Sequence, residues 1–401
     1  MQDCVILAGI GCGTPDTMTA EVRDSISGAE IWIGARRILS GLPDGQAEKF
    51  AATKPGEILT ALLENRGRRC CVLYSGDSGF YSGARSLVPL LEEQGIAYRI
   101  LPGISSVQVM AARMAEPWQG WKLVSAHGVE CDAVAAVNTG APALFLTGGT
   151  LGPSSLCGQL VRAGLGSLRA VVGENLSYET EKIIHGTAAE FLQREFAPLS
   201  VLWVEAAPKP WNGPCQGIRD EEFIRGSVPM TKREVRACAV SMAAPSPGAV
   251  LWDVGAGTGS VSVELALSTP SGRVFAVECE QEGIDLIRRN RERFGAWNVT
   301  PVHGKAPDAL ADLPAPDAVF IGGTKGGLAE ILDVVLEKNP SARIVISAVT
   351  METIAQSSQL LTERGLEFEA TQISAARTRQ AGRFHMMAAQ NPVFLIEARK
   401  N

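Results

Sequence analysis

The C-terminal half contains a glycine-rich segment with the residue types and spacing of a nucleoside-binding loop. An apolar run predicts a buried strand that ends near Asp253, and Gly255-Ala256-Gly257-Thr258-Gly259 follows it directly. Glycines let a ligand approach the backbone, and the helix expected after the loop offers free N–H groups. Glu278 ends the next expected strand, about 20 residues on, where a carboxylate can bind ribose hydroxyl groups. We therefore predict that this loop binds a nucleoside.

The glycine spacing bears on which nucleoside is bound. A dinucleotide fingerprint reads G-x-G-x-x-G/A, whereas this loop reads G-x-G-x-G and has Ser260 where the last glycine would stand. Asp253 precedes the loop, and a carboxylate suits a cationic sulfonium ligand with an ammonium group better than a pyrophosphate. The pattern favours S-adenosylmethionine, while a nicotinamide cofactor of an oxidoreductase and a purely structural glycine turn are the alternatives.

Two further glycine turns belong to the same half. Gly304-Lys305-Ala306-Pro307 follows a strand-like segment at the place where a nucleotide fold would hold adenine, and Phe320-Ile321-Gly322-Gly323 ends another strand. Upstream, we expect a helix over 231–242, with Thr231 as its N-cap and Glu234 completing a capping box.

Four polar segments follow expected strands in the N-terminal half, namely Gly9-Ile10-Gly11-Cys12-Gly13, Ser75-Gly76-Asp77-Ser78, Pro102-Gly103-Ile104-Ser105-Ser106 and Ser125-Ala126-His127-Gly128. The first is as consistent with a tight turn as with a ligand loop. The Gly-Asp turn is more specific, because it presents a carboxylate at a strand tip. His127 is as consistent with bracing a turn as with moving a proton.

Strands alternate with helical patterns in both halves, which predicts an α/β fold. A length of 401 residues favours two or three domains, and we interpret the proline- and glycine-rich stretch 205–229 as the linker. No apolar run approaches the roughly 18 residues of a membrane helix, so we expect no membrane association. The first residues have no basic region typical of a signal peptide.

Charge and cysteine content narrow the function classes. The net charge is −6, with 37 basic and 43 acidic residues and no basic block, so nucleic-acid binding is not expected. Nine cysteines without a C-x-x-C pair predict neither a disulfide framework nor a zinc site. We expect a reducing, cytoplasmic setting and no metal.

The C-terminal motifs resemble the decarboxylating methyltransferases of cobalamin biosynthesis, which act at carbon 15 of precorrin-6Y. The resemblance covers about residues 228–398 and rests on Thr231-Lys232-Arg233-Glu234-Val235-Arg236, the 253–260 loop, 304–307, 320–323 and Asn391-Pro392-Val393. Lys305 departs from the family pattern, which commonly has an acid there. The departure affects a side-chain contact to adenine but not backbone contacts of Ala306.

The N-terminal segments resemble the tetrapyrrole methylases, specifically the enzyme that methylates carbon 5 in the same pathway. This resemblance covers about residues 2–206, includes Ile33-Gly34-Ala35-Arg36-Arg37, and departs at Ser78, where relatives usually have proline. The two halves in this order resemble the fused precorrin-6Y C5,15-methyltransferases (decarboxylating).

The resemblance implies a two-lobed tetrapyrrole methylase domain over 1–206, a linker over 207–227 and a Rossmann-like class I methyltransferase domain over 228–401. It also implies a precorrin substrate, precorrin-8X as product, one S-adenosylmethionine site per domain and a homo-oligomer. The implied cofactor residues are Thr231, Asp253, Gly255, Ala256, Gly257, Thr258, Gly259, Glu278, Gly304, Ala306, Gly322, Gly9, Gly76, Asp77, Ser105, Ser106 and Leu146. A tetrapyrrole-binding protein without catalytic activity is the alternative from another class.

A substrate with many carboxylates requires cationic side chains to bind it, and arginine suits this because its guanidinium binds a carboxylate through two hydrogen bonds. The candidates near the C-terminal site are Lys325, Arg377, Arg379, Arg383 and His385, and those near the N-terminal site are Arg36, Arg37 and Arg113. An ordinary solvated loop over 377–385, and basic residues that simply flank a strand end at 36–37, are the alternative interpretations.

Overall fold

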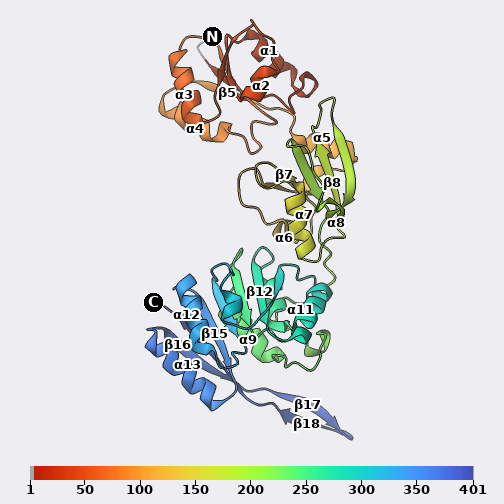
Figure 1. The fold of residues 1–401 in the computed structure, drawn as a ribbon, viewed down its shortest axis with the longest axis vertical. Helices are drawn as coiled ribbons and strands as arrows, with labels where there is room; N and C mark the ends of the chain where they lie inside the picture. Colours follow the sequence, from red (N-terminus) through yellow and green to blue (C-terminus); the bar gives the residue numbers. More distant parts are fainter. Residues whose placement is uncertain (1–3, 401) are drawn as a thin grey trace. The chain divides into compact units, whose positions relative to one another are not determined.

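The computed structural model describes residues 4–400, and the chain divides into two compact units (Figure 1). The first unit runs to Cys131 and also contains Pro142–Gly158 and Arg169–Glu205. The second contains Asp132–Ala141, Gln159–Leu168 and everything from Ala206 onward. Within residues 4–400, no helix is long and apolar enough to cross a membrane.

The first sheet of the first unit is entirely parallel, with strand order β3-β2-β4-β1-β5. Its strands are β1 (Val5–Gly9), β2 (Ile31–Gly34), β3 (Glu48–Ala51), β4 (Cys70–Tyr74) and β5 (Tyr98–Leu101), and the helices between them are α1 (Ala20–Gly28), α2 (Arg36–Ser40), α3 (Pro55–Glu64) and α4 (Ala84–Glu93). Leu7 and Val72 pack into one core layer and Ala8 and Leu73 into another. The central strands are therefore buried on both faces, which explains why they read as continuous apolar runs.

The second sheet of the first unit is mixed, with strand order β6-β7-β10-β8-β9. Only the β6–β7 pair is parallel. Its strands are β6 (Lys122–Ser125), β7 (Ala143–Leu146), β8 (Arg169–Glu174), β9 (Lys182–Thr187) and β10 (Ser200–Val204), and the same unit contains helices α5 (Ser106–Met114) and α8 (Ala188–Phe191). Helix α6 (Ala133–Val137) is assigned to the second unit, and α7 (Pro153–Arg162) crosses the division after Gly158. Phe145 and Trp203 are fully buried in this sheet.

The second unit is built on a seven-stranded sheet of order β13-β12-β11-β14-β15-β19-β16, whose first five strands are parallel. The strands are β11 (Val250–Val254), β12 (Arg273–Glu278), β13 (Val299–His303), β14 (Ala318–Ile321), β15 (Arg343–Ala348), β16 (Glu367–Ile373) and β19 (Val393–Arg399). The helices are α9 (Arg233–Ala243), α10 (Ser260–Ser268), α11 (Gln281–Phe294), α12 (Leu328–Lys338) and α13 (Met351–Glu363). Strand order reverses between β11 and β14, and open α/β sheets bind ligands at the carboxyl ends of the strands beside such a reversal.

A two-stranded hairpin of β17 (Ala376–Ala381) and β18 (Phe384–Ala389) extends away from this sheet (Figure 1). Phe384, Met386 and Met387 are exposed on it. Apolar side chains gathered on a projecting element are typical of a surface that contacts another molecule.

The expected capping box at the start of α9 is wrong. The helix begins at Arg233 with Lys232 as its N-cap, and no side chain caps it. Instead, the Glu234 carboxylate accepts two hydrogen bonds from Arg377, at 3.1 and 2.6 Å. A charged bidentate partner is stronger than the backbone N–H that a capping box would supply, so Glu234 turns to the arginine.

Candidate functional sites

The glycine loop after β11 packs directly against the turn after β14. Gly255 has φ +73°, and a Cβ at this position would lie 2.7 Å from the backbone nitrogen and oxygen of Gly323. Gly257 and Gly259 also have positive φ. Only glycine combines this left-handed backbone with so close an approach, which explains the spacing seen in the sequence.

Glu278, at the end of β12, is the acceptor around which this loop is organised. Its Oε2 accepts the N–H of Gly257 at 2.8 Å, and its Oε1 accepts those of Cys279 and Glu280 at 2.7 and 2.9 Å. Burial opposes the charge of this carboxylate, but the hydrogen bonds outweigh it and the pKa of Glu278 lies below its usual value. Because a carboxylate oxygen has two lone pairs, Oε2 can still accept a ribose hydroxyl group.

Asp253 lies behind the loop and not at the cavity wall. Its side chain is fully buried, Oδ2 accepts a hydrogen bond from Ser262 of α10, and Oδ1 has no partner. Burial raises the pKa of Asp253 to about 7, the Ser262 hydrogen bond acts in the opposite direction, and the charge of Glu278 adds to the rise. The role expected from the sequence, contact with a ligand ammonium group, stays a prediction.

A small cavity of about 30 Å³ opens at the carboxyl ends of β11, β12 and β14. Of the predicted residues, Gly255, Glu278, Gly304, Ala306 and Lys325 line it. Thr324, at the end of the glycine turn after β14, also lines it, as does Cys279, which belongs to no motif. Lys325 forms an ion pair with Glu280 at the rim, and the hydrogen bond that its ammonium donates to Glu280 raises the pKa of Lys325.

The remaining basic candidates of this unit do not line that cavity. Arg377 is bound to Asp220 and Glu234. Arg379, Arg383 and His385 are exposed on the β17–β18 hairpin. The sequence interval 377–385 does not reveal this separation, because a hairpin displaces its tip from the sheet whose strands it connects.

In the first unit, predicted residues that follow β4 and β5 or end β7 converge on one cavity of about 430 Å³. Gly76, Asp77, Ser105, Ser106 and Leu146 all line it. Thr147, which belongs to the same strand end as Leu146, lines it too. The lining residues that the motifs did not include, or left undecided, are Cys12, Phe80, Tyr81, Ser125, His127, Gly173, Leu176 and Leu199–Val201. Leu199–Val201 had no signal in the sequence, since an apolar strand such as β10 reads as core.

Asp77 braces the loops that frame this cavity. Its Oδ1 accepts the N–H of Gly79 at 2.8 Å, and its Oδ2 accepts the N–H of Gly103 at 3.1 Å. A Cβ on Gly9 would lie 2.8 Å from both Gly103 N and Gly76 O, so these three turns meet backbone to backbone. Ser78, which replaces the family's proline, is buried and donates its hydroxyl to Leu101 O at 3.0 Å. The turn is thus held by a hydrogen bond in place of a proline ring.

Arg37 lies between this cavity and a second one of about 850 Å³. Its guanidinium donates to the Tyr178 hydroxyl at 3.0 Å and to Ser75 at 3.3 Å. Arg23, which belongs to no sequence motif, lines the second cavity. Arg36 is exposed and Arg113 pairs with Glu181, and neither lines these two cavities.

Comparison with known proteins agrees with this two-part organisation. Residues 222–400 match the family model described as precorrin methyltransferase domain, and residues 4–192 match tetrapyrrole (corrin/porphyrin) methylases. A Sinorhizobium protein named precorrin-6Y C(5,15)-methyltransferase [decarboxylating] is 34% identical over 352 residues, which cover 86% of this chain and 84% of that protein.

Other relatives correspond to the C-terminal half alone. A Pyrobaculum calidifontis protein named probable cobalt-precorrin-6B C(15)-methyltransferase (decarboxylating) is 46% identical over 47% of this chain and 98% of its own length. The crystal structure named precorrin-6y C5,15-methyltransferase from Geobacter metallireducens is 40% identical and covers 47% of this chain and all of that one, with a TM-score of 0.45.

Fold, sites and matched domains together define a two-unit α/β methyltransferase of tetrapyrroles. The match to the Sinorhizobium relative extends over most of both proteins. The chain therefore belongs to the precorrin-6Y C(5,15)-methyltransferase (decarboxylating) family.

Proposed function

We propose that this chain transfers methyl groups from S-adenosylmethionine to carbons 5 and 15 of precorrin-6Y and removes the ring C acetate carboxyl as carbon dioxide, giving precorrin-8X. The observation that carries the proposal is that each unit has a cavity lined by glycine turns and a carboxylate at strand ends, of about 430 Å³ in the first unit and about 30 Å³ in the second. Family membership favours this function over a nicotinamide oxidoreductase and over a carrier without activity.

We assign carbon 15 and the decarboxylation to residues 228–401. Glu278 supports a ribose site there, because it stays ionised and retains acceptor capacity toward a hydroxyl group. Gly304 and Ala306 would flank the adenine, and the Gly255–Gly259 loop would pass beneath the methionine part of the donor. Lys325 at the rim would meet a substrate carboxylate once it leaves Glu280.

We assign carbon 5 to residues 1–206, with 207–227 as the connection between the domains. The 430 Å³ cavity would take the methyl donor between Asp77, Ser105 and Leu146. The 850 Å³ cavity beside it would take the tetrapyrrole, and Arg37 faces both, so its fork could hold a carboxylate near the methyl group. The two cavities share Ser75 and Leu199 as well, which supports their adjacency.

The chemistry demands alignment more than proton transfer. An electron-rich meso carbon attacks the methyl carbon while the carbon–sulfur bond breaks, and S-adenosylhomocysteine leaves as a neutral thioether. Methylation at carbon 15 leaves a cationic conjugated ring. The electron pair of the acetate C–C bond can flow into that ring as carbon dioxide departs, and exclusion of water from the carboxylate favours this step.

The division of labour is tested with the full chain, precorrin-6Y and methyl-labelled donor. Asp77→Ala should abolish methylation at carbon 5 and retain carbon dioxide release, whereas Glu278→Gln should abolish methylation at carbon 15 together with carbon dioxide release. If Asp77→Ala stopped carbon dioxide release and Glu278→Gln did not, the assignment of the two units would be reversed.

We also propose a homo-oligomer in a reducing cytoplasm. Support for the first comes from the exposed Phe384, Met386 and Met387 of the β17–β18 hairpin, which a second copy could cover. Support for the second comes from the nine cysteines, all of which are free thiols within the described residues. Light scattering of the wild type and of a Phe384→Ser, Met386→Ser variant tests the oligomer, since the variant should be smaller.

A further inference from the structure

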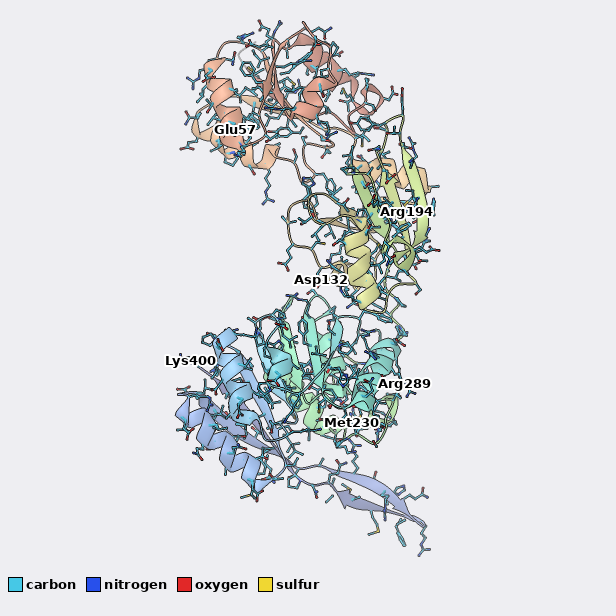
Figure 2. The ribbon with its side chains drawn as sticks, in the orientation of Figure 1. Glu57, Asp132, Arg194, Met230, Arg289 and Lys400 are labelled. Atoms are coloured by element: carbon cyan, nitrogen blue, oxygen red, sulfur yellow. The ribbon has the colours of Figure 1, made fainter. Side chains whose placement is uncertain are left out.

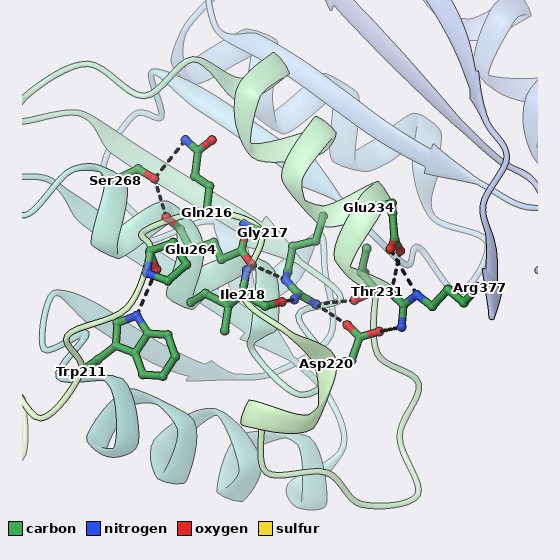
Figure 3. Close-up of polar contacts among 12 residues, drawn as sticks. Trp211, Gln216, Gly217, Ile218, Asp220, Thr231, Glu234, Glu264, Ser268 and Arg377 are labelled. Atoms are coloured by element: carbon green, nitrogen blue, oxygen red, sulfur yellow. Dashed lines mark hydrogen bonds and ion pairs between the residues drawn. The ribbon is translucent and has the colours of Figure 1, made fainter. Parts of the chain in front are cut away.

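Residues 217–231, here called the strap, lie against the second unit instead of forming a loose connection (Figure 3). Gly217 and Ile218 donate their backbone N–H groups to the two oxygens of Glu264, each at 3.0 Å. Farther along, Ile224 donates to Asn290 Oδ1 at 2.8 Å and accepts from its Nδ2 at 3.0 Å. Met230, labelled in Figure 2, packs against the hydrophobic core of the unit.

One guanidinium fixes both ends of the strap. Arg236 of α9 is fully buried, and it donates from Nη2 to Ile218 O at one end and from Nη1 to Thr231 O, 2.7 Å away, at the other. Its Nε donates to Glu264 at 2.6 Å and its Nη1 also reaches Asp220 at 3.3 Å. The planar fork of arginine can serve carbonyls and carboxylates in several directions at once, which a lysine ammonium on a single atom cannot.

The strap in turn touches the glycine loop. The carbonyl oxygen of Pro229 lies 2.8 Å from the position that a Cβ on Gly257 would occupy, so the two backbones are in direct contact. Asn290 Nδ2, which holds Ile224, also donates to Thr258 O at 2.9 Å. A displacement of the strap would therefore also displace the Gly255–Gly259 loop, in which Gly257 donates its N–H to Glu278.

We propose that Arg236 is a positioning residue of the methyl-donor site in the second unit, acting through Thr231 and the strap on the Gly255–Gly259 loop. The proposal rests on the function proposed above. None of the hydrogen-bond partners of Arg236 in the described part of the chain lines the 30 Å³ cavity. Its effect is therefore on the positions of the strap and of the Gly255–Gly259 loop. Asp220 extends the same network to Arg377 at the base of the hairpin, at 3.0 Å.

The test uses the full chain and two conservative variants. Replacing Arg236 by an apolar residue would leave Glu264 charged and buried without its partner, and such a variant would fail to fold. Arg236→Lys keeps the charge beside Glu264 but gives up the simultaneous bonds to Ile218 and Thr231. We expect its dissociation constant for S-adenosylhomocysteine at the C-terminal site to rise about tenfold or more, as for a modest misplacement of binding groups. The rate of carbon 15 methylation at saturating donor should change little.

Two further variants complete the design. Arg291→Lys is the matched control, because Arg291 is also buried on this unit but donates to Val299 O and not to the strap. Asp220→Asn neutralises one of the two carboxylates paired with Arg236, leaves Glu264 in place, and should give an intermediate effect. To isolate the C-terminal site, calorimetric titrations are made in an Asp77→Ala background.

The outcomes separate this inference from the proposed function. If the Asp77→Ala parent does not bind S-adenosylhomocysteine, the proposed function of the second unit fails. The inference is overturned if the parent binds but Arg236→Lys binds equally well. It is also overturned if Arg291→Lys weakens binding as much as Arg236→Lys, since general loosening would then be the cause. Faster hydrogen exchange over 217–231 in Arg236→Lys alone, with weaker binding, supports it.

Discussion

Substitution of the buried Asp253 by asparagine should change how the stability of the second unit depends on pH. The pKa of this carboxyl rises from 3.8 to about 7, because burial and, to a lesser extent, the charge of Glu278 outweigh the opposing hydrogen bonds from Ser262. Between these pH values the folded chain keeps a proton that the unfolded chain releases. The free energy of unfolding therefore falls as pH increases through this window. The loss reaches its full size only above pH 7, where Asp253 is ionised in the folded chain as well.

The size of the effect follows from the same two values. Between pH 5 and pH 8 the wild-type unit should lose about 3 kcal/mol through this group, which corresponds to roughly a hundredfold change in an unfolding constant. In Asp253→Asn the amide carbonyl can still accept the Ser262 hydroxyl, and no charge is formed. The contribution of this residue to the pH dependence should then disappear.

Hydrogen exchange of the peptide over 250–263, measured without ligand by mass spectrometry, provides the assay. Comparing wild type and variant at one pH cancels the intrinsic exchange rates. The protection factor of the variant divided by that of the wild type should rise about a hundredfold from pH 5 to pH 8. Ser262→Ala should act in the opposite direction, because it removes the donor that favours the charged form. A ratio that is the same at both pH values would refute the reasoning.

Three further variants test other parts of the sites. Gly255→Ala places a Cβ 2.7 Å from the Gly323 backbone at a positive φ, which costs roughly 1–3 kcal/mol of strain. Calorimetry should then show weaker S-adenosylhomocysteine binding at the C-terminal site, and unaltered binding would mean that the two turns can separate freely. Arg37→Met should raise the KM for precorrin in carbon 5 methylation about tenfold, and an unchanged KM would argue against a carboxylate contact. Arg379→Ala with Arg383→Ala should raise the precorrin KM at carbon 15 while leaving the donor KM unchanged, and equal substrate affinity would assign the hairpin a role other than substrate binding.

Local sequence patterns predicted the two α/β halves and most of the loops that the tertiary structure gathers. Gly255 and Gly257 stand out in the sequence because a left-handed backbone favours glycine, and Glu278 stands out because it ends the next strand and accepts the Gly257 N–H. The Gly76-Asp77 and Ser105-Ser106 segments could be identified for a related reason, since they follow strands whose ends meet at one sheet edge.

Long-range contacts decided the rest. Sequence spacing does not show that Asp253 is enclosed behind its own loop, or that Glu234 turns from the helix start to Arg377, 143 residues away. It also does not show that Arg236 binds both Ile218 and Glu264, because these partners are 18 and 28 residues away and are brought together by packing. The types of residue at strand ends follow from local backbone and turn requirements. The burial of a side chain, which sets its charge state and the partners it can contact, is decided only when distant segments pack together.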